Sequence, residues 1–278
     1  MAKKILITGG AGMFGQEATK LFVAWGYEVL CATKNDLDVT FLNAVEDFFE
    51  KNRGIDFVIH ASAYTKVDDA ESNEEQAFLV NAEGAKNIAL VTKKYGIAVI
   101  YISTDYVFDG EKNSPYLPAD KTNPINVYGA SKLAGEKNIR RENDAHYIAR
   151  TSWLYGAYGK NFVDTMIDLS QKQKTLRIVN DQFGCPTWTH DLAEMIKNLI
   201  EKKMPFGTYH LCNSGYTSWF GLTQKIFEIL KTDIELIAVS SAEFPRPAKR
   251  PKFSAMDNAN CSRAWDEALT QYLTSKKQ

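Results

Sequence analysis

The chain reads Lys4-Ile-Leu-Ile-Thr-Gly-Gly-Ala-Gly-Met-Phe-Gly15 near its start, an apolar run that leads into glycines. The run predicts a buried strand, and Gly9, Gly12 and Gly15 follow it at Gly-x-x-Gly-x-x-Gly spacing. Such glycines permit a tight turn, let the backbone approach a pyrophosphate and let helix and strand pack closely. The start of the helix also offers free N–H groups to phosphate. Glycine spacing alone would suit a plain turn, but its place directly after the first strand favours a nucleotide site.

The first half of the chain alternates short apolar runs with amphipathic stretches. Strands are predicted at Lys4–Thr8, Glu28–Ala32, Phe57–His60, Ala98–Ser103 and Tyr147–Arg150. Helices are predicted at Gly12–Trp25, Ala44–Asn52, Glu74–Tyr95 and Val127–Asn143. Strands separated by helices form βαβ units, and right-handed crossovers place helices on both faces of a parallel sheet. We therefore predict an α/β fold with a doubly wound parallel sheet of the Rossmann type, which binds ligands at the carboxyl ends of its strands.

The pattern loosens after about residue 150. Helices are predicted at Asn161–Gln173, Thr189–Lys202 and Ser218–Lys231, and strands at Leu176–Val179, Thr208–His210 and Glu235–Val239. We expect residues 1–150 to form a dinucleotide-binding domain. Residues 151–278 are expected to form a smaller α/β lobe that binds the substrate, with some segments returning to the main sheet.

Composition excludes several classes of protein. The 278 residues are 45% hydrophobic and 24% charged, and 33 basic against 34 acidic side chains give a net charge of −1. This balance argues against binding to nucleic acid by general electrostatics. No run approaches the ~18 apolar residues of a membrane span, and the first apolar run is too short for a signal peptide. Four cysteines lie far apart without a Cys-x-x-Cys pair, so we expect reduced thiols in a cytoplasmic protein.

Tyr128 and Lys132 are four residues apart, which places both side chains on one face of a helix. A lysine ammonium beside a phenol is expected to lower the pKa of the tyrosine, which can then protonate a carbonyl oxygen. A second such pair, Tyr272 and Lys276, occurs in the C-terminal tail, so the spacing by itself carries little weight. Only Tyr128 follows a strand that ends in a hydroxyl, at Thr104. A plain strand-end cap is the alternative role of that hydroxyl.

The end of the second predicted strand bears on the cofactor. It reads Cys31-Ala32-Thr33-Lys34, without the acid that usually binds the ribose 2′-hydroxyl of NAD. Lys34 could meet a 2′-phosphate, so NADPH is favoured. Asp36 or Asp38, slightly later in the chain, could bind a ribose hydroxyl, which leaves NADH open.

Longer motifs carry a resemblance to a known family. Thr8–Gly15, Tyr101–Gly110 (YISTDYVFDG) and Asn123–Glu136 (NPINVYGASKLAGE) together resemble the extended short-chain dehydrogenase/reductases. Five further stretches are similar to the dTDP-4-dehydrorhamnose reductases among them. They are His60–Asp68 (HASAYTKVD), Arg150–Gly156 (RTSWLYG), Asn161-Phe162, Asp181–Thr187 (DQFGCPT) and Arg246–Pro251 (RPAKRP). The resemblance covers nearly the whole chain.

The resemblance implies an NAD(P)H-dependent reduction of the C4 keto group of dTDP-4-dehydro-6-deoxy-L-mannose. The product would be dTDP-L-rhamnose, for surface polysaccharide. By this resemblance Tyr128 is the general acid, Lys132 holds the cofactor ribose and tunes Tyr128, and Thr104 hydrogen-bonds the keto oxygen. The cofactor would be bound by Tyr128, Lys132, Gly9, Gly12, Met13, Phe14, Gly15, Thr33, Lys34, Asp38, Val39, Ala61, Ser62 and Ala63.

The resemblance also implies which side chains face the sugar nucleotide: Val67, Thr104, Asp105, Tyr106, Trp153, Asn161 and Arg250. Arg250 would approach the nucleotide diphosphate, since guanidinium groups suit two-pronged phosphate contacts. A solvated basic surface is the alternative for its loop. Related dehydratases carry an acidic pair after the threonine, whereas Asp105 here is followed by Tyr106, which favours reduction over elimination.

Two alternatives to this function stay open: a reductase or epimerase of another nucleotide sugar, or a non-catalytic regulatory subunit of the same fold. The four histidines are scattered, so no metal site is predicted. Some relatives dimerise through clustered carboxylates and a divalent ion, and a homodimer is an open expectation. Asn81 could hydrogen-bond backbone near the catalytic strand or be purely structural.

Overall fold

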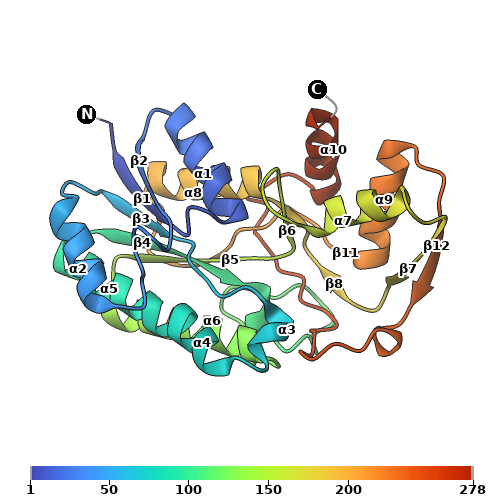
Figure 1. Ribbon diagram of the computed structural model, residues 1–278, viewed down its shortest axis with the longest axis horizontal. Coiled ribbons are helices and arrows are strands. Elements are labelled where there is room, and N and C mark those ends of the chain that lie inside the picture. The colour runs from blue at the N-terminus through green and yellow to red at the C-terminus, as the bar shows by residue number, and fades with distance from the viewer. Residues whose placement is uncertain (1, 277–278) are drawn as a thin grey trace.

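The computed structural model describes residues 2–276, and a six-stranded parallel sheet is its centre (Figure 1). The spatial order is β10-β5-β4-β3-β1-β2. The strands are β1 Lys4–Thr8, β2 Glu28–Ala32, β3 Phe57–His60, β4 Ala98–Thr104, β5 His146–Thr151 and β10 Gly207–His210. All of the strands predicted for the first half are confirmed within one residue at each end. The doubly wound parallel sheet is likewise confirmed.

The strand order creates a crevice beside β1. Its neighbours are β2 on one side and β3 on the other, so the chain reverses its winding direction there. The register aligns Thr8 at the end of β1 with Ala32 on β2 and His60 on β3. Ligands of open α/β sheets bind outside the carboxyl ends of the strands at such a switch point. The loops after β1 and β3 are therefore placed to form a cofactor site.

Helices cover both faces of the sheet, as Figure 1 shows. Helices α1 (Met13–Ala24) and α8 (Thr189–Glu201) lie on one face, and α2 (Leu42–Lys51), α5 (Gly84–Lys94) and α6 (Val127–Glu142) on the other. Alternate β1 side chains serve the two cores, because Ile5 and Ile7 pack with α1 and α8 while Leu6 packs with α2 and α5. Burial of each such side chain stabilises the fold by roughly 1.5–3 kcal/mol.

The helix predicted over Glu74–Tyr95 is not regular. It consists of α4 (Glu74–Phe78), a π-helical turn η1 (Leu79–Glu83) and α5. A π turn inserts an extra residue into the helical repeat, and such turns are frequent at functional sites. The turn carries Asn81 into the protein interior. The short helix α3 (Val67–Ala70) precedes this segment.

The C-terminal part packs beside the sheet with its own hydrophobic core. Helices α7 (Phe162–Ser170) and α9 (Trp219–Leu230) pack on the parallel pair β7 (Thr175–Val179) and β12 (Glu235–Val239), and α10 (Trp265–Ser275) packs against α9 in the same core. The shorter elements are β6 Leu154–Tyr155, β8 Phe183–Gly184, β9 Thr187–Trp188, β11 Thr217–Ser218, η2 Asp105–Val107 and η3 Ser241–Glu243. The segment treated as a C-terminal tail is helix α10 as far as it is described. Among residues 2–276, no helix is long and apolar enough to cross a membrane.

Candidate active site

A cavity of about 880 Å³ opens at the carboxyl ends of β1, β3 and β4 and extends to the C-terminal part. Its walls contain most of the residues singled out in the sequence: Gly9, Gly12, Met13, Phe14, Gly15, Lys34, Asp38, Val39, Ala61, Ser62, Ala63, Val67, Thr104, Asp105, Tyr106, Tyr128, Lys132 and Trp153. The structure thus brings together two groups that are separated in sequence, the glycine turn and the Tyr128 helix.

The glycine turn is shaped so closely that side chains are excluded. Gly9 has a φ of +70°, and a Cβ there would lie 2.8 Å from backbone atoms of Ala61. A Cβ on Gly15 would lie 2.3 Å from the carbonyl oxygen of Gly9. Gly12 is the N-cap of α1 and has no side-chain cap, so the first N–H groups of the helix stay open to an anion. This cradle fits the pyrophosphate of a dinucleotide.

The segment after β2 forms a second wall of the cavity, beside the glycine turn. Lys34 and Asp38 line the cavity, with Lys34 Nζ 3.8 Å from Asp38 Oδ2. Asp36 is occupied within its own turn, where it accepts hydrogen bonds from Thr33 N (2.9 Å) and Thr33 Oγ1 (2.7 Å). The Lys34 side chain is 77% exposed, so a positive charge is free to meet an added phosphate.

Tyr128 and Thr104 come from the start of α6 and the end of β4. Asn126 caps α6 by accepting a hydrogen bond from Gly129 N (2.7 Å) and ties the cap to a distant loop by donating to Lys249 O (2.8 Å). A Cβ on Gly129 would lie 2.1 Å from Tyr106 O, so glycine alone lets α6 approach η2. The side chains of Tyr128 and Thr104 consequently line the same cavity.

The pKa of Tyr128 moves opposite to the expected direction. Burial raises the pKa of Tyr128 to about 12, and the Asp105 carboxylate adds to this while the hydrogen bond with Thr104 opposes it. The lowered pKa predicted from the Tyr128/Lys132 pair is therefore wrong for the protein by itself. The physical reason is that desolvation of a buried phenolate outweighs the neighbouring groups. The phenol keeps its proton at neutral pH.

Lys132 is almost fully buried below Tyr128. Its Nζ donates a hydrogen bond to Ile102 O (2.7 Å) and lies 4.0 Å from the centroid of the Tyr101 ring. Burial lowers the pKa of Lys132 to about 7, although the charge of Glu136 opposes this. An ammonium has three N–H donors, so donors remain for the cavity after Ile102 is satisfied.

Glu136 anchors the helix that carries both residues. Its carboxylate accepts two hydrogen bonds of 2.8 Å from Arg150 and one of 2.7 Å from Ser103. Burial would raise the pKa of Glu136, but the Arg150 contacts outweigh it and hold the pKa low. Because Ser103 and Arg150 lie on β4 and β5, this buried network fixes α6 against the sheet.

Asp105 is a buried carboxyl on the wall of the cavity beside Thr104. Ser254 donates a hydrogen bond to its Oδ2, and Thr104 Oγ1 donates to its Oδ1 (3.1 Å). Burial raises the pKa of Asp105 to about 7 despite these two hydrogen bonds. The carboxyl can therefore exchange a proton near neutral pH.

Trp153 adopts a left-handed backbone conformation with a φ of +47°. Its ring stacks on Trp219 with centroids 3.4 Å apart and planes 4° apart, and both rings line the cavity. A Cβ on Gly184 would lie 2.5 Å from the Trp153 ring, so the ring is also packed against that glycine. Trp219 was not predicted as a site residue, because only the fold brings the start of α9 to Trp153.

Three of the predicted site residues are not among those that line the cavity. Thr33 turns toward Asp36. Asn161 caps α7 by accepting from Asp164 N (3.0 Å) and donates to Gly156 O (3.1 Å). Arg250 forms a two-pronged ion pair with Asp68, whose pKa it lowers.

Some residues on the cavity wall were not predicted as site residues. They include Tyr64, Thr65, Gln76, Lys160 and Trp219. Tyr64 is held in place by Asn81, whose side chain accepts from Tyr64 N (2.8 Å) and donates to Tyr64 O (3.1 Å). Tyr64 and Thr65 lie inside the motif HASAYTKVD, which was the available signal. No feature of the sequence marked Lys160 as a site residue, because only the folded loop between β6 and α7 places it on the cavity wall.

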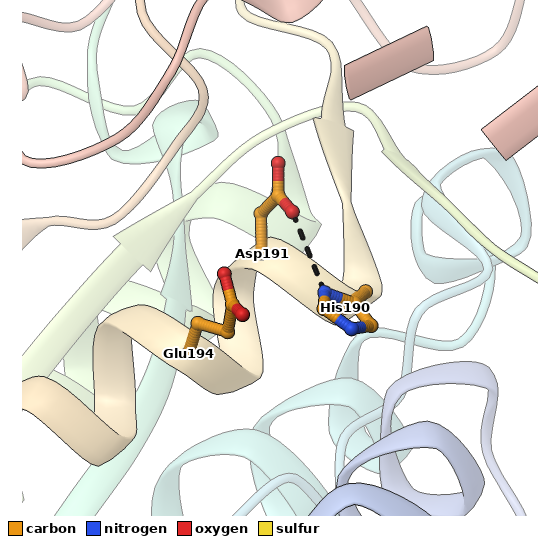
Figure 2. Close-up of side chains that lie close together, drawn as sticks. All are labelled: His190, Asp191 and Glu194. Atoms are coloured by element: carbon orange, nitrogen blue, oxygen red, sulfur yellow. Dashed lines mark ion pairs between the residues drawn. The ribbon is translucent and has the colours of Figure 1, made fainter. Parts of the chain in front are cut away.

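A separate cluster of His190, Asp191 and Glu194 lies at the start of α8 (Figure 2). Both oxygens of Asp191 are already occupied, by Arg263 Nε (2.8 Å), Arg263 Nη2 (2.6 Å) and Asn213 Nδ2 (2.6 Å). His190 Nδ1 is 3.5 Å from Asp191 Oδ1. A guanidinium on the carboxylate repels a cation, so these contacts describe a structural anchor of α8. The absence of a metal site stays a prediction.

Comparison with known proteins gives consistent matches along the chain. Residues 3–277 match the family described as RmlD substrate binding domain. The chain is 38% identical to a dTDP-4-dehydrorhamnose reductase of Streptomyces griseus, with 96% of this chain and 91% of the relative covered. It is 36% identical to the spore coat polysaccharide biosynthesis protein SpsK of Bacillus subtilis, with 98% of each covered. The crystal structure of a dTDP-4-dehydrorhamnose reductase of Bacillus anthracis in complex with NADP is 38% identical, with a TM-score of 0.95 over 99% of this chain and 100% of that one.

Proposed function

Since this chain belongs to the RmlD substrate binding domain family, we propose that it is an NAD(P)H-dependent reductase of a dTDP-linked 4-keto-6-deoxy sugar. The substrate is dTDP-4-dehydrorhamnose and the product dTDP-L-rhamnose, a precursor of polysaccharide. NADPH is the preferred cofactor and NADH a second one. The observation that carries the proposal is the convergence of Thr104, Tyr128 and Lys132 on one cavity with the glycine cradle.

Bound NADPH supplies the hydride that reduces C4 of the sugar. Tyr128 donates its phenolic proton to the oxygen at C4, and Thr104 holds that oxygen by a hydrogen bond once its hydroxyl turns from Asp105 to the sugar. The raised pKa of Tyr128 suits this role, because the phenol stays protonated until negative charge develops on the substrate oxygen. No second carboxylate follows Asp105, so the chain lacks the acidic pair that would eliminate water.

Lys132 holds the ribose of the cofactor with the N–H donors that Ile102 leaves free. The adenosine end lies against Lys34, Asp38 and Val39, and Lys34 accounts for the preference for a 2′-phosphate. The glycine cradle receives the pyrophosphate, together with Met13, Phe14, Ala61, Ser62 and Ala63 along the same wall.

The sugar nucleotide occupies the end of the cavity that is nearer to residues 151–278. Val67, Asp105, Tyr106 and Trp153 face the sugar. Arg250, although paired with Asp68, stands beside Tyr106 and contacts the nucleotide diphosphate. Asn161 contributes through the loop that it holds rather than by direct contact, and Thr33 through the turn before Lys34.

The proposal extends to three coarser features of the protein. Residues 1–150 bind the cofactor and residues 151–278 mainly bind the substrate. Four free cysteines support a reducing, cytoplasmic compartment. A homodimer is proposed from the resemblance, and the sedimentation coefficient of the purified protein tests it.

The test of the function is oxidation of NADPH by the purified protein with dTDP-4-dehydrorhamnose generated in the same tube. We expect turnover with NADPH and slower turnover with NADH. Tyr128→Phe should lower kcat by about 10²–10⁴-fold, since the general acid is removed. Tyr27→Phe is the control, because that hydroxyl only meets Glu201 on the surface.

Three results would contradict this proposal. Full turnover by Tyr128→Phe would exclude Tyr128 as the proton donor. Turnover with another nucleotide sugar but not with dTDP-4-dehydrorhamnose would show that the protein is a reductase of a different substrate. NADPH binding without turnover on any such sugar would favour a regulatory subunit.

A further inference from the structure

The loop between β6 and α7 is clamped at both ends. The carbonyl of Gly156 accepts hydrogen bonds from Tyr272 Oη (2.8 Å) and from Asn161 Nδ2 (3.1 Å). Asn161 is also the N-cap of α7, with its side chain accepting from Asp164 N. The hydrogen bond between residues 156 and 161 closes the intervening segment, residues 157–160, into a short protruding turn.

This turn reaches across to the glycine cradle. Gly159 has a φ of +71°, which favours glycine, and a Cβ placed on it would lie 3.8 Å from the Cβ of Met13. Met13 is the first residue of α1, and Lys160 lines the same cavity as Gly9 and Gly12. A residue of the C-terminal part is thereby placed beside the phosphate-binding helix end of the first domain.

Lys160 is exposed and makes no ion pair or side-chain hydrogen bond with any residue that the structure describes. Two other lysines line the cavity, and both lie at other parts of it: Lys132 donates to Ile102 O, and Lys34 lies near Asp38 at the end of β2, where we propose that it meets the 2′-phosphate. The first turn of α1, residues 13–16, contains no basic side chain. The cradle thus offers backbone N–H groups for a diphosphate but no cation of its own.

We propose that Lys160 binds the diphosphate of the cofactor from the C-terminal side, closing the cradle formed by the glycine turn. This rests on the proposed function only in that the cavity takes NADPH. A lysine–phosphate contact is a charge-assisted hydrogen bond. The Lys160 ammonium and the partial positive charge of the helix start would both attract the diphosphate. Asn161 and Tyr272 act as positioning residues, because they hold the turn that carries Lys160.

The test is direct binding of NADPH to the full chain by isothermal calorimetry, without a sugar nucleotide. Lys160→Gln should raise the Kd for NADPH by roughly five- to tenfold, the loss expected for one exposed lysine–phosphate contact. NADH should lose affinity by the same factor, because its diphosphate is identical. Lys160→Arg keeps the charge and should retain most of the affinity. Lys172→Gln removes an exposed lysine just beyond α7 and should leave Kd unchanged.

An unchanged Kd for NADPH in Lys160→Gln would overturn the assignment. A raised KM for the sugar nucleotide in that same variant would then assign Lys160 to the substrate. A thermal unfolding midpoint equal to that of the unaltered protein excludes misfolding as the cause of any loss. If the unaltered protein binds NADPH through Lys160 but reduces no sugar, the proposed function fails while this assignment stands.

Discussion

At the scale of the residue, the site depends on how burial sets the protons of Tyr128, Lys132 and Asp105. Tyr128 keeps its proton with a pKa of about 12, while the pKa values of Lys132 and Asp105 are both about 7. Desolvation is the largest cause in all three. The cavity therefore contains Tyr128, which stays protonated at neutral pH, and two groups, Lys132 and Asp105, whose charge changes around neutral pH.

Asp105 should give the protein a measurable dependence of stability on pH. Its folded-state pKa is raised from 3.8 to about 7, so between these values the native carboxyl holds a proton that the unfolded chain has released. The contribution of Asp105 to stability is thus full below the lower value and is lost as pH rises through the upper one. Asp105→Asn removes this pH-dependent contribution to the free energy of unfolding. Its free energy of unfolding relative to the unaltered protein should rise by on the order of 2 kcal/mol between about pH 5 and about pH 8.

Urea unfolding of both proteins at the two pH values measures this difference. Comparison with the unaltered protein cancels the other groups that titrate, such as His60 and His210. A difference between the two proteins that stays constant with pH would show that Asp105 is ionised throughout.

At the scale of the element, the decisive features are junctions where glycine lets two segments touch. Gly15 lets α1 lie on the turn after β1, and Gly129 lets α6 lie on η2. The first contact forms the phosphate cradle, and the second brings Tyr128 to Thr104. The π turn η1 works without a glycine: it turns Asn81 inward, and Asn81 holds Tyr64 on the cavity wall.

Gly15→Ala should disrupt cofactor binding at this junction. Its Cβ would meet the Gly9 carbonyl oxygen at 2.3 Å, so the turn and α1 must separate. We expect the Kd for NADPH to rise by more than about tenfold, since a backbone shift moves several N–H donors together. Calorimetric titration with NADPH measures the change.

Gly54→Ala is the matched control. Gly54 has a φ of +79° and no neighbour within 4 Å of an added Cβ, so the substitution strains the backbone without touching the cavity. It should lower the thermal midpoint and leave NADPH affinity intact. Equal loss of affinity in both variants would assign the effect of Gly15→Ala to general destabilisation.

At the scale of the whole molecule, the cavity exists because the C-terminal part is attached to the sheet at several places. Strand β10 and helix α8 belong to the sheet layers. Asp68 on α3 pairs with Arg250, and Asn126 at the start of α6 holds Lys249 O. These contacts hold the parts that meet around the substrate in a fixed arrangement.

Asp68→Asn should weaken substrate binding more than it weakens the fold. The Asp68–Arg250 pair is partly exposed, with side chains 34% and 18% accessible, so its loss should cost no more than about 1 kcal/mol of stability. Without its carboxylate partner, Arg250 loses the orientation in which we propose that it contacts the substrate diphosphate. Steady-state kinetics should show a KM for the sugar nucleotide raised by roughly fivefold, with the Kd for NADPH unchanged.

Glu75→Gln, an exposed charge change on the neighbouring helix α4, should leave both constants unchanged. The pattern for Asp68→Asn is the reverse of that expected for Lys160→Gln, so the two variants separate the diphosphate of the substrate from that of the cofactor. A lower KM in Asp68→Asn would instead show that Asp68 competes with the substrate for Arg250.

The parallel sheet and the glycine cradle could be predicted from the sequence, because local periodicity and close spacing along the chain encode them, whereas the Thr104–Tyr128–Lys132 group was identified through longer motifs that resemble a known family. Eighteen of the predicted site residues, many of them named through that resemblance, line one cavity. Tertiary structure alone decided the direction of the Tyr128 pKa, the stacking of Trp219 on Trp153, the pairing of Arg250 with Asp68 and the approach of Lys160 to the cradle. Desolvation and contacts between distant segments arise only when the chain is packed, and no local pattern records them.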